Sequence, residues 1–385
     1  MPRSSSIEGV GRPSTQADWP QMAEHRKSIT LKDVAAAANV SVGMASRVLG
    51  GYGSYSENTR KAVVKAAKIL DYRVNGVARS LRLKRTRAIG VMINEIASYH
   101  WTVFVQGVEE AARQAGYHVI LCNTADDAQL EREYLNDLRE RGVDGIIVSP
   151  LAKNLPVFSK VAQSGFPIVL VNSRIDDAEI TSIRSDDQQA ASEAVIYLAS
   201  LGHKRIGIVA GQQELETGRS RLNGYRAGLA HLELPYLEHF VAFGNYDQAQ
   251  AYEATERLVT MSKPPTAILV CSEMMTGAAL RCLKDYGVSI PTELSVVGFD
   301  DPAWASFFSP AITTLREQRF YMGRLASDTL IAAIDGPLAA VRKLPEILLR
   351  TELVVRESCT RPRRGAAITL SGNPSAANYR LLADD

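Results

Sequence analysis

The spacing of apolar residues changes along the chain and predicts two kinds of structure. Between residues 30 and 72, apolar residues recur three and four positions apart, which is the period of one face of an α-helix. This spacing predicts three short helices, each preceded by a residue that can cap it, namely Thr30, Ser41 and Ser56. The predicted buried faces are Leu31, Val34, Ala35 and Ala38 in the first helix, Met44, Ala45, Val48 and Leu49 in the second, and Val63, Val64, Ala67 and Leu70 in the third.

From residue 88 onward, short runs of continuous apolar residues alternate with longer stretches of helical period. Strands are predicted at 88–93, 118–122, 145–148, 167–171, 205–209, 267–270 and 294–298, and helices at 103–114, 129–141, 188–201, 219–232, 249–261 and 274–286. Continuous apolar strands separated by helices are typical of parallel sheets that are covered on both faces. This number of strands and helices is too large for one small sheet. We therefore expect two α/β lobes with a ligand cleft beyond the carboxyl ends of the strands.

These patterns predict the domain organisation. An all-α helix-turn-helix domain is expected over residues 29–74, and a short helix with a basic linker over 75–87. A two-lobed α/β domain is expected over 88–359. Residues 1–28 are rich in Ser, Pro and Gln and lack an apolar period, so we expect a disordered tail. The small and polar residues of 360–385 predict a second flexible tail.

Composition and charge narrow the possible partners. The chain is 46% apolar and 22% charged, and no segment approaches the ~20 apolar residues that cross a bilayer, which favours a cytoplasmic protein with no membrane partner. The net charge of +2 conceals an asymmetry: residues 28–88 carry 12 Lys and Arg against three acids, a net +9 that leaves −7 elsewhere. Such a basic block indicates a polyanion partner, although a merely solvated basic surface is the alternative.

Two short helices joined by a tight turn at Asn39 and Val40, with a basic surface, are typical of a helix-turn-helix that reads duplex DNA. The second helix would enter the major groove with its other face, which is formed by Val42, Gly43, Ser46 and Arg47. Arg47 can pair with guanine or a phosphate, Ser46 with base or backbone, and Val42 with a thymine methyl group. Thr30, at the start of the first helix, is a further candidate DNA contact. A small helical bundle that docks another protein is the alternative.

Several ordered motifs carry a family resemblance. They include TLKDVA at 30–35, SRVL at 46–49, NGVARSLR at 75–82, RGVDGII at 141–147, LGHKRIG at 201–207 and SVVGFDD at 295–301. In these motifs the chain resembles the LacI/GalR family of bacterial transcriptional regulators, and the resemblance covers nearly everything from residue 29 to 359. Departures occur at Met44, Ala45, Gly50 and Val74, where the family usually has Thr, Val, Asn and Pro, and they leave the operator sequence in doubt.

The resemblance implies how the DNA is held. In the family, the segment after the third helix is a hinge helix that folds on the operator and enters the minor groove as a pair, one per subunit. Leu81 would wedge between central base pairs, Ala78 would lie beside it, Asn75 would begin the helix, and Arg79 and Arg82 would lie near phosphates. A homodimer on a palindromic operator follows from this arrangement.

The resemblance also implies that residues 88–359 dimerise and bind an effector, as a sensing domain similar to periplasmic sugar-binding proteins. Its ligand would be a small sugar-like molecule such as a sugar, sugar acid or sugar phosphate, and the genes controlled would be those of carbohydrate metabolism. The candidate effector-binding residues are Tyr99, His100 and Trp101 in the loop after the first strand, Asp186, Arg221, Tyr246, Cys271 and Asp300. Cys271 stands where the family usually has Asn, which favours a less polar ligand on that side or a different pose. Packing, subunit contacts, surface ion pairs and helix caps are the alternatives for these residues.

Other functions have little support in the sequence. The four cysteines lie far apart without metal-ligand spacing, so we expect neither a disulfide nor a bound metal. No nucleophile, zinc-protease, phosphate-loop or dinucleotide motif is present, so neither an enzyme nor a cofactor is predicted. A periplasmic sugar receptor would have the same two lobes but not the basic N-terminal block. Two alternatives to an induced repressor stay open, namely an activator and a regulator that binds DNA more tightly when its ligand is bound. The direction of the response depends on which state of the protein the ligand prefers.

Overall fold

The computed structural model describes residues 29–72, 85–175, 180–336 and 346–363, with Ile368 and Leu370. Two compact units divide the chain between Arg82 and Leu83, and each is described by itself. The predicted tail at 1–28, most of the tail at 360–385 and the hinge residues Asn75, Ala78, Arg79, Leu81 and Arg82 lie outside the described residues.

The N-terminal unit contains the three predicted helices, α1 (Leu31–Ala37), α2 (Val42–Gly50) and α3 (Glu57–Ile69). The predicted caps are confirmed. The carboxylate of Asp33 accepts a hydrogen bond of 2.7 Å from the backbone N–H of Thr30. The hydroxyl oxygens of Ser41 and Ser56 each accept from a backbone N–H three residues later, at 3.2 and 3.1 Å. These bonds satisfy amide groups that the first turn of a helix leaves unpaired.

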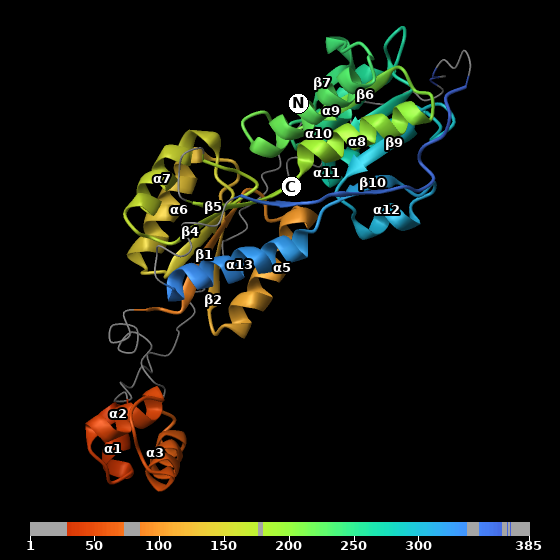
Figure 1. Cartoon of the computed structure of the whole chain (residues 1–385). Helices are drawn as coiled ribbons and strands as arrows, with labels where there is room; N and C mark the ends of the chain where they lie inside the picture. The colour runs from red at the N-terminus through yellow and green to blue at the C-terminus, as the bar shows by residue number, and fades with distance from the viewer. Residues whose placement is uncertain are drawn as a thin grey trace, which may run out of the picture. The chain divides into compact units, whose positions relative to one another are not determined.

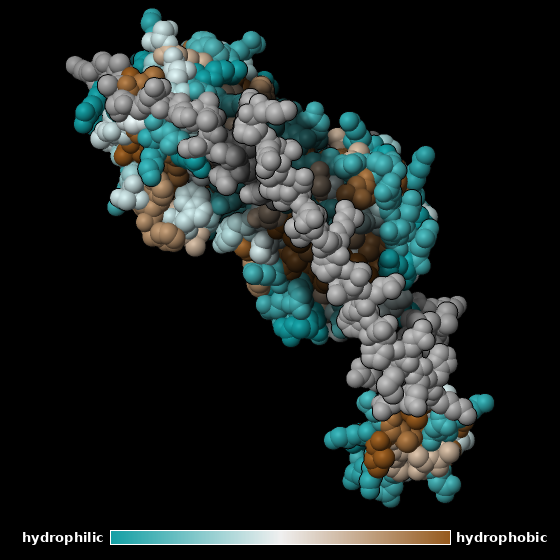
Figure 2. Space-filling view, turned by 180° about the vertical axis from the view of Figure 1, so that it is seen from behind, coloured by the Kyte–Doolittle hydropathy of each residue, from teal (hydrophilic) through white to brown (hydrophobic). Residues whose placement is uncertain are grey.

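The core of this unit is formed by Val34, Ala35, Ala45, Val48, Val63, Ala66 and Ala67. The prediction for the third helix was wrong in one residue, because Val64 is 45% exposed and Ala66 is buried instead. On α3 the buried stripe runs through positions 63, 66 and 67, and position 64 is turned away from it. Figure 2 shows an apolar area on the surface of this unit. The surface of the unit is therefore not uniformly polar.

The C-terminal unit consists of the two predicted α/β lobes (Figure 1). The first sheet has the order β11-β5-β4-β3-β1-β2, and the second has the order β12-β10-β9-β8-β6-β7. All strand pairs are parallel except β10 with β12. The first sheet comprises β1 (Ala88–Ile93), β2 (His118–Asn123), β3 (Gly145–Val148), β4 (Ile168–Val171), β5 (Thr181–Ser185) and β11 (Ile347–Leu349). The second comprises β6 (Ile206–Ala210), β7 (Val241–Phe243), β8 (Ala267–Val270), β9 (Ser295–Phe299), β10 (Thr313–Arg316) and β12 (Glu352–Val354).

Helices cover both faces of the first sheet. Ile89, Val91 and Ile93 of β1 face α5 (Tyr99–Gln114) and α13 (Arg319–Asp335), whereas Met92 faces α6 (Ala128–Glu140) and α7 (Leu155–Gln163). In the second lobe, α8 (Asp187–Ser200) packs on α9 (Glu216–His231), and α10 (Gln248–Val259) packs on α11 (Glu273–Asp285). The short helix α12 (Ala303–Phe307) follows β9. Among the described residues, no helix combines the length and apolar character that a bilayer-spanning segment requires.

The chain passes between the lobes three times, from β5 to α8, from β10 to α13 and from β11 to β12. Helix α13 therefore follows β10 of the second lobe in sequence but packs beside α5 in the first (Figure 1). These crossings place the carboxyl ends of both sheets next to the connecting segments. A ligand that touches both lobes would lie close to these connecting segments.

Candidate functional site

The outward face of α2 is the first candidate site. Val42 is 43% exposed, Gly43 and Arg47 are exposed, and Ser46 is partly exposed with its hydroxyl 3.1 Å from that of Tyr52. The tight turn before this helix is formed by Asn39, whose positive φ of 52° is a backbone conformation that asparagine tolerates. Thr30 is also exposed, at the start of α1. The predicted division of α2 into a buried and an outward face is therefore present.

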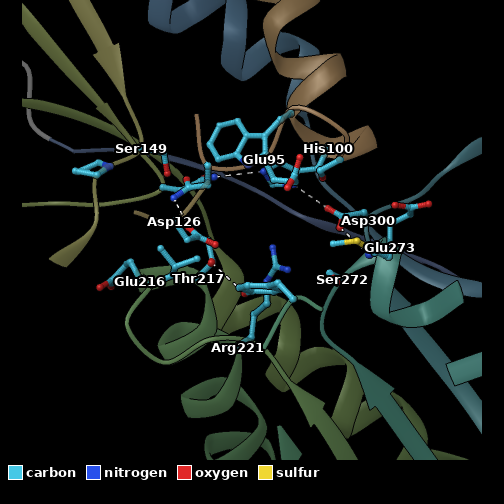
Figure 3. Close-up of a pocket in the computed structure, with 18 residues that line it drawn as sticks. Glu95, His100, Asp126, Ser149, Glu216, Thr217, Arg221, Ser272, Glu273 and Asp300 are labelled. Atoms are coloured by element: carbon cyan, nitrogen blue, oxygen red, sulfur yellow. Dashed lines mark hydrogen bonds and ion pairs between the residues drawn. The ribbon is translucent and has the colours of Figure 1, made fainter. Parts of the chain in front are cut away.

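A cavity between the two lobes is the second candidate site (Figure 3). Its volume is about 130 Å³. It is lined by Asn94, Glu95, Ser98, His100, Trp101, Asp126, Ser149, Pro150, Asn172, Leu215, Glu216, Thr217, Arg221, Tyr246, Ser272, Glu273, Met274 and Asp300. Most of these residues follow the carboxyl ends of strands β1 to β4 and β6 to β9. The cavity thus lies at the edge where an open parallel sheet binds its ligands.

Five of the predicted effector-binding residues line this cavity, namely His100, Trp101, Arg221, Tyr246 and Asp300. The expectation that residues 99–101 form a loop was wrong, because they are the first residues of α5 and Ser98 precedes that helix as its N-cap. Trp101 is only 7% exposed and its ring packs edge-on against Phe104, so it belongs to the core as well as to the cavity wall.

The other three predicted residues do not line the cavity. Tyr99 is 43% exposed and lines a different hollow, together with Asp301 and Arg316. Asp186 caps α8, where its carboxylate accepts from the backbone N–H of Gln189 at 3.2 Å. The Cys271 side chain is fully buried, and burial raises the pKa of its thiol to about 12, so the thiolate needed for reactivity is not formed near neutral pH.

Arg221 is held by a buried polar network. Its guanidinium donates to the carbonyl oxygen of Cys271 at 2.7 Å, to Glu317 at 3.1 Å and to Asp187 at 3.3 Å, while the ring of Phe299 lies 4.0 Å away. Burial raises the pKa of Asp187 despite the nearby Arg221. Burial also acts to raise the pKa of Glu317, but Arg319 and Arg221 hold it well below its usual value. The arginine therefore lies between two acidic side chains that are almost fully buried.

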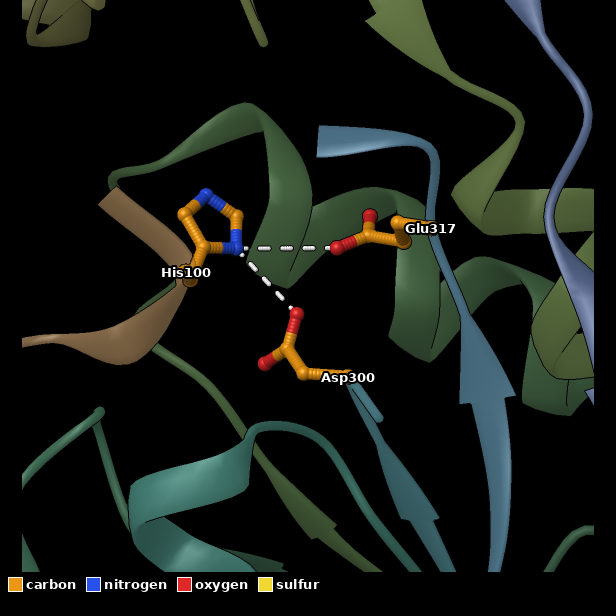
Figure 4. Close-up of side chains that lie close together, drawn as sticks. All are labelled: His100, Asp300 and Glu317. Atoms are coloured by element: carbon orange, nitrogen blue, oxygen red, sulfur yellow. Dashed lines mark hydrogen bonds and ion pairs between the residues drawn. The ribbon is translucent and has the colours of Figure 1, made fainter. Parts of the chain in front are cut away.

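A second polar link joins the lobes at His100 (Figure 4). Its Nδ1 lies 3.2 Å from the carboxylate of Asp300, at the end of β9, and 3.5 Å from that of Glu317, on the segment between β10 and α13. One His and two carboxylates at this distance can ligate a metal ion. Here Glu317 already accepts from the guanidinium groups of Arg319 and Arg221, whose positive charges oppose a divalent cation. We therefore interpret the cluster as a link between the lobes.

Sequence reasoning missed the acidic part of the site. Glu95, Asp126, Glu216 and Glu273 line the cavity, and Asp187 rather than Asp186 contacts Arg221. The signal for three of them was present, because Glu95, Asp126 and Glu273 each follow within a few residues the end of a strand that the apolar pattern predicts. Glu317 had no such signal, since the strand before it was not predicted.

Two family models match the chain over most of its length. Residues 30–75 match the description "Bacterial regulatory proteins, lacI family", and residues 86–351 match "Periplasmic binding proteins and sugar binding domain of LacI family". The chain belongs to the LacI family. It is accordingly a transcriptional regulator with a helix-turn-helix domain and an effector domain of the sugar-binding type.

Individual LacI-family proteins are similar over most of their length. The HTH-type transcriptional regulator RegA of Clostridium acetobutylicum is 32% identical over 337 residues, which is 86% of this chain and 99% of that protein. The lac repressor dimer bound to operator and the anti-inducer ONPF has a TM-score of 0.78 at 26% identity, covering 87% of this chain and 100% of that one. The transcriptional regulator CelR in complex with cellobiose has a TM-score of 0.65 at 28% identity, covering 86% and 99%.

Proposed function

We propose that this protein is a cytoplasmic repressor of carbohydrate-metabolism genes that binds a palindromic operator as a homodimer and responds to a small sugar-like effector. The observation that carries the proposal is the combination, in one chain, of an exposed recognition-helix face and a cavity at the carboxyl ends of strands from both lobes. The relatives add support, because one is a repressor dimer on its operator and another holds a disaccharide.

The effector would control DNA binding through its contacts with both lobes. A ligand that touches the two lobes binds one relative lobe arrangement more tightly than another, and only that difference can shift the equilibrium. Trp101 and Tyr246 offer ring surfaces to a sugar, and Asp300 offers acceptor oxygens to its hydroxyl groups. Because linkage is reciprocal, saturating operator should change the effector's affinity by the same factor by which the effector changes operator affinity.

Selection of DNA by the full-length protein tests the proposed function. Duplexes enriched from a random pool at modest salt should carry two symmetric half-sites, since a two-fold symmetric dimer presents two identical recognition helices. Enrichment of no sequence, with sugars both present and absent, would reject the repressor role. Enrichment of a single unpaired half-site would reject the palindromic dimer.

Replacement of Arg47 with alanine should weaken binding to the selected operator by roughly 30-fold, about 2 kcal/mol, and relax the preference at one base position. The reason is that, among the described residues, Arg47 is the only cation on the outward face of α2. Fluorescence anisotropy with labelled duplexes measures the affinity. Arg60→Ala is the matched control, because it removes the same charge from an exposed residue of α3 that pairs with Glu57. Equal losses from both variants would assign Arg47 to the phosphate backbone.

The hinge residues are proposed to contact the minor groove. Asn75, Ala78, Arg79, Leu81 and Arg82 lie outside the described residues, and the family resemblance is what supports their role. Leu81→Ala should greatly reduce bending of an operator duplex labelled at both ends for energy transfer, because no apolar wedge remains to offset unstacking. Effector affinity of the same variant should be retained. Unchanged bending would reject the wedge.

A further inference from the structure

The charge of the cavity wall is strongly asymmetric (Figure 3). Five carboxylates line it, from Glu95, Asp126, Glu216, Glu273 and Asp300. The only cationic side chains among the described lining residues are Arg221 and, when protonated, His100. Most of the charged groups in the wall are therefore carboxylates, and they come from both lobes.

Two of these carboxylates are compensated inside the protein. Glu216 forms ion pairs with Arg219 at 2.8 Å and with Arg184 at 3.6 Å. Asp300 lies 3.2 Å from His100 and accepts a hydrogen bond of 3.0 Å from the backbone N–H of Glu273. Glu216 therefore already has cationic partners, and Asp300 already has a backbone donor and the His100 ring within hydrogen-bond distance.

The remaining three carboxylates have neutral hydrogen-bond donors only. Glu95 accepts from the backbone N–H of Ala97 at 2.9 Å, Asp126 from the Asn94 amide at 2.7 Å and Glu273 from the Trp304 indole at 3.0 Å. Within the described ranges, no lysine or arginine forms an ion pair with any of the three. Burial raises the pKa of Asp126 and of Glu273, and in each case a neighbouring carboxylate adds to the shift. Burial therefore disfavours the charged forms of Asp126 and Glu273, and a cation bound beside them would offset that cost.

Arg221 is not available to balance them. Its guanidinium is shared between Glu317, Asp187 and the carbonyl oxygen of Cys271, as described above, and it faces the ring of Phe299. A phosphate or carboxylate ligand would therefore meet three acidic side chains without a lysine or arginine partner, and an arginine already bound to Glu317 and Asp187. Repulsion of that kind excludes an anion.

We propose that the effector is a polyhydroxylated amine, of which an amino sugar is the simplest form, and that sugar phosphates and sugar acids are excluded. This inference rests on the effector role proposed above and names its ligand class. The ammonium group would lie among Glu95, Asp126 and Glu273, and the hydroxyl groups would meet the neutral polar wall formed by Ser149, Asn172, Thr217 and Ser272. Glu95 and Asp126 belong to the first lobe and Glu273 to the second, so carboxylates of both lobes would attract a bound cation.

Calorimetric titration of the full-length protein with matched ligands tests the class. The probes are glucosamine, galactosamine and mannosamine, each beside its neutral sugar and its 6-phosphate. In at least one series the amine should bind at least tenfold more tightly than the neutral sugar, and no phosphate should bind. Stronger binding of a neutral sugar or of any phosphate overturns the amine assignment, and so does the absence of binding by every amine.

Operator affinity measured with the same probes separates this inference from the proposed function. If a neutral sugar or a phosphate shifts operator affinity, the effector role stands and the amine assignment fails. If no probe of any class binds or shifts operator affinity, the amine assignment fails and the sugar-like effector role loses its support as well.

Charge-removing variants test the assigned carboxylates. Asp126→Asn and Glu273→Gln keep the shape of the side chain, and each should lower the ratio of amine to neutral-sugar affinity by about tenfold. Glu253→Gln, on an exposed residue of α10, is the control that should leave the ratio unchanged. Thermal unfolding of each variant checks the fold. An unaltered ratio in both site variants, with folding intact, rejects the assignment.

Discussion

Replacing Arg221 with alanine is expected to lower the free energy of unfolding by about 3–5 kcal/mol and to abolish the effector's influence on operator binding. The side chain is buried and lies against the carboxylates of Asp187 and Glu317, which are themselves buried. Without the guanidinium, at least one of these carboxylates must be ionised without a partner or take up a proton. Either outcome lowers the free energy of unfolding.

Denaturation by urea, followed by fluorescence, measures the loss. Arg219→Ala is a matched control on the same helix, because Arg219 is 39% exposed in its side chain and pairs with Glu216 at the surface. A surface pair of this kind is worth about 1 kcal/mol or less. Adding Asp187→Asn to Arg221→Ala should recover part of the stability, since a neutral amide then replaces the buried carboxyl group that lost its arginine. An equal loss of unfolding free energy in the two arginine variants would show that Arg221 stabilises the fold no more than Arg219 does.

Loss of the effector response has a geometric reason. Arg221 lines the cavity and also contacts Glu317, which lies two residues before Arg319 at the start of α13. Arg319 in turn donates to Glu317 and to Asn172 of the first lobe. The side chain that would sense the ligand is therefore bonded to the segment that connects the lobes.

Replacing Gly107 with alanine is expected to destabilise the first lobe by about 3 kcal/mol, at the upper end of the usual cost of overpacking. Gly107 is in α5 at the point where this helix crosses α13, and a Cβ atom built there would overlap the carbonyl oxygen of Phe320. Gly323 of α13 faces the backbone of Phe104 in the same way. Because the obstacle on each side is backbone, no rotamer change can relieve the clash, and the helices must separate.

Gly277→Ala provides the control for this prediction. Gly277 is an exposed residue within α11, and a Cβ atom there would meet no other atom within 4 Å. Alanine restricts the unfolded chain and favours the helix, so this variant should stabilise the protein by roughly 0.5–1 kcal/mol. Thermal unfolding should therefore shift in opposite directions for the two variants. A shift in the same direction for both variants would contradict the close contact between α5 and α13.

The amino-acid sequence alone predicted the elements whose stabilising features are local. Serine and threonine caps mark the starts of α1, α2 and α3, and continuous apolar runs mark β1, β3 and β8 at their observed bounds. The strands β5, β7, β10, β11 and β12 and the helices α7, α12 and α13 were not predicted. The missed strands span only three to five residues each. Pairing with neighbouring strands, rather than composition, makes so short a segment a strand.

The sequence by itself determined that a basic helix-turn-helix precedes two α/β lobes, because periodicity, caps and charge are properties of residues close together in the chain. Only the tertiary structure decided which charges meet. Arg221 and Glu317 are 96 positions apart, and His100 and Asp300 are 200 apart. Asp187 is buried against the arginine while Asp186 caps the helix, because successive residues at a helix start point in different directions. Such neighbours arise from the three passages of the chain between lobes, which no local pattern encodes.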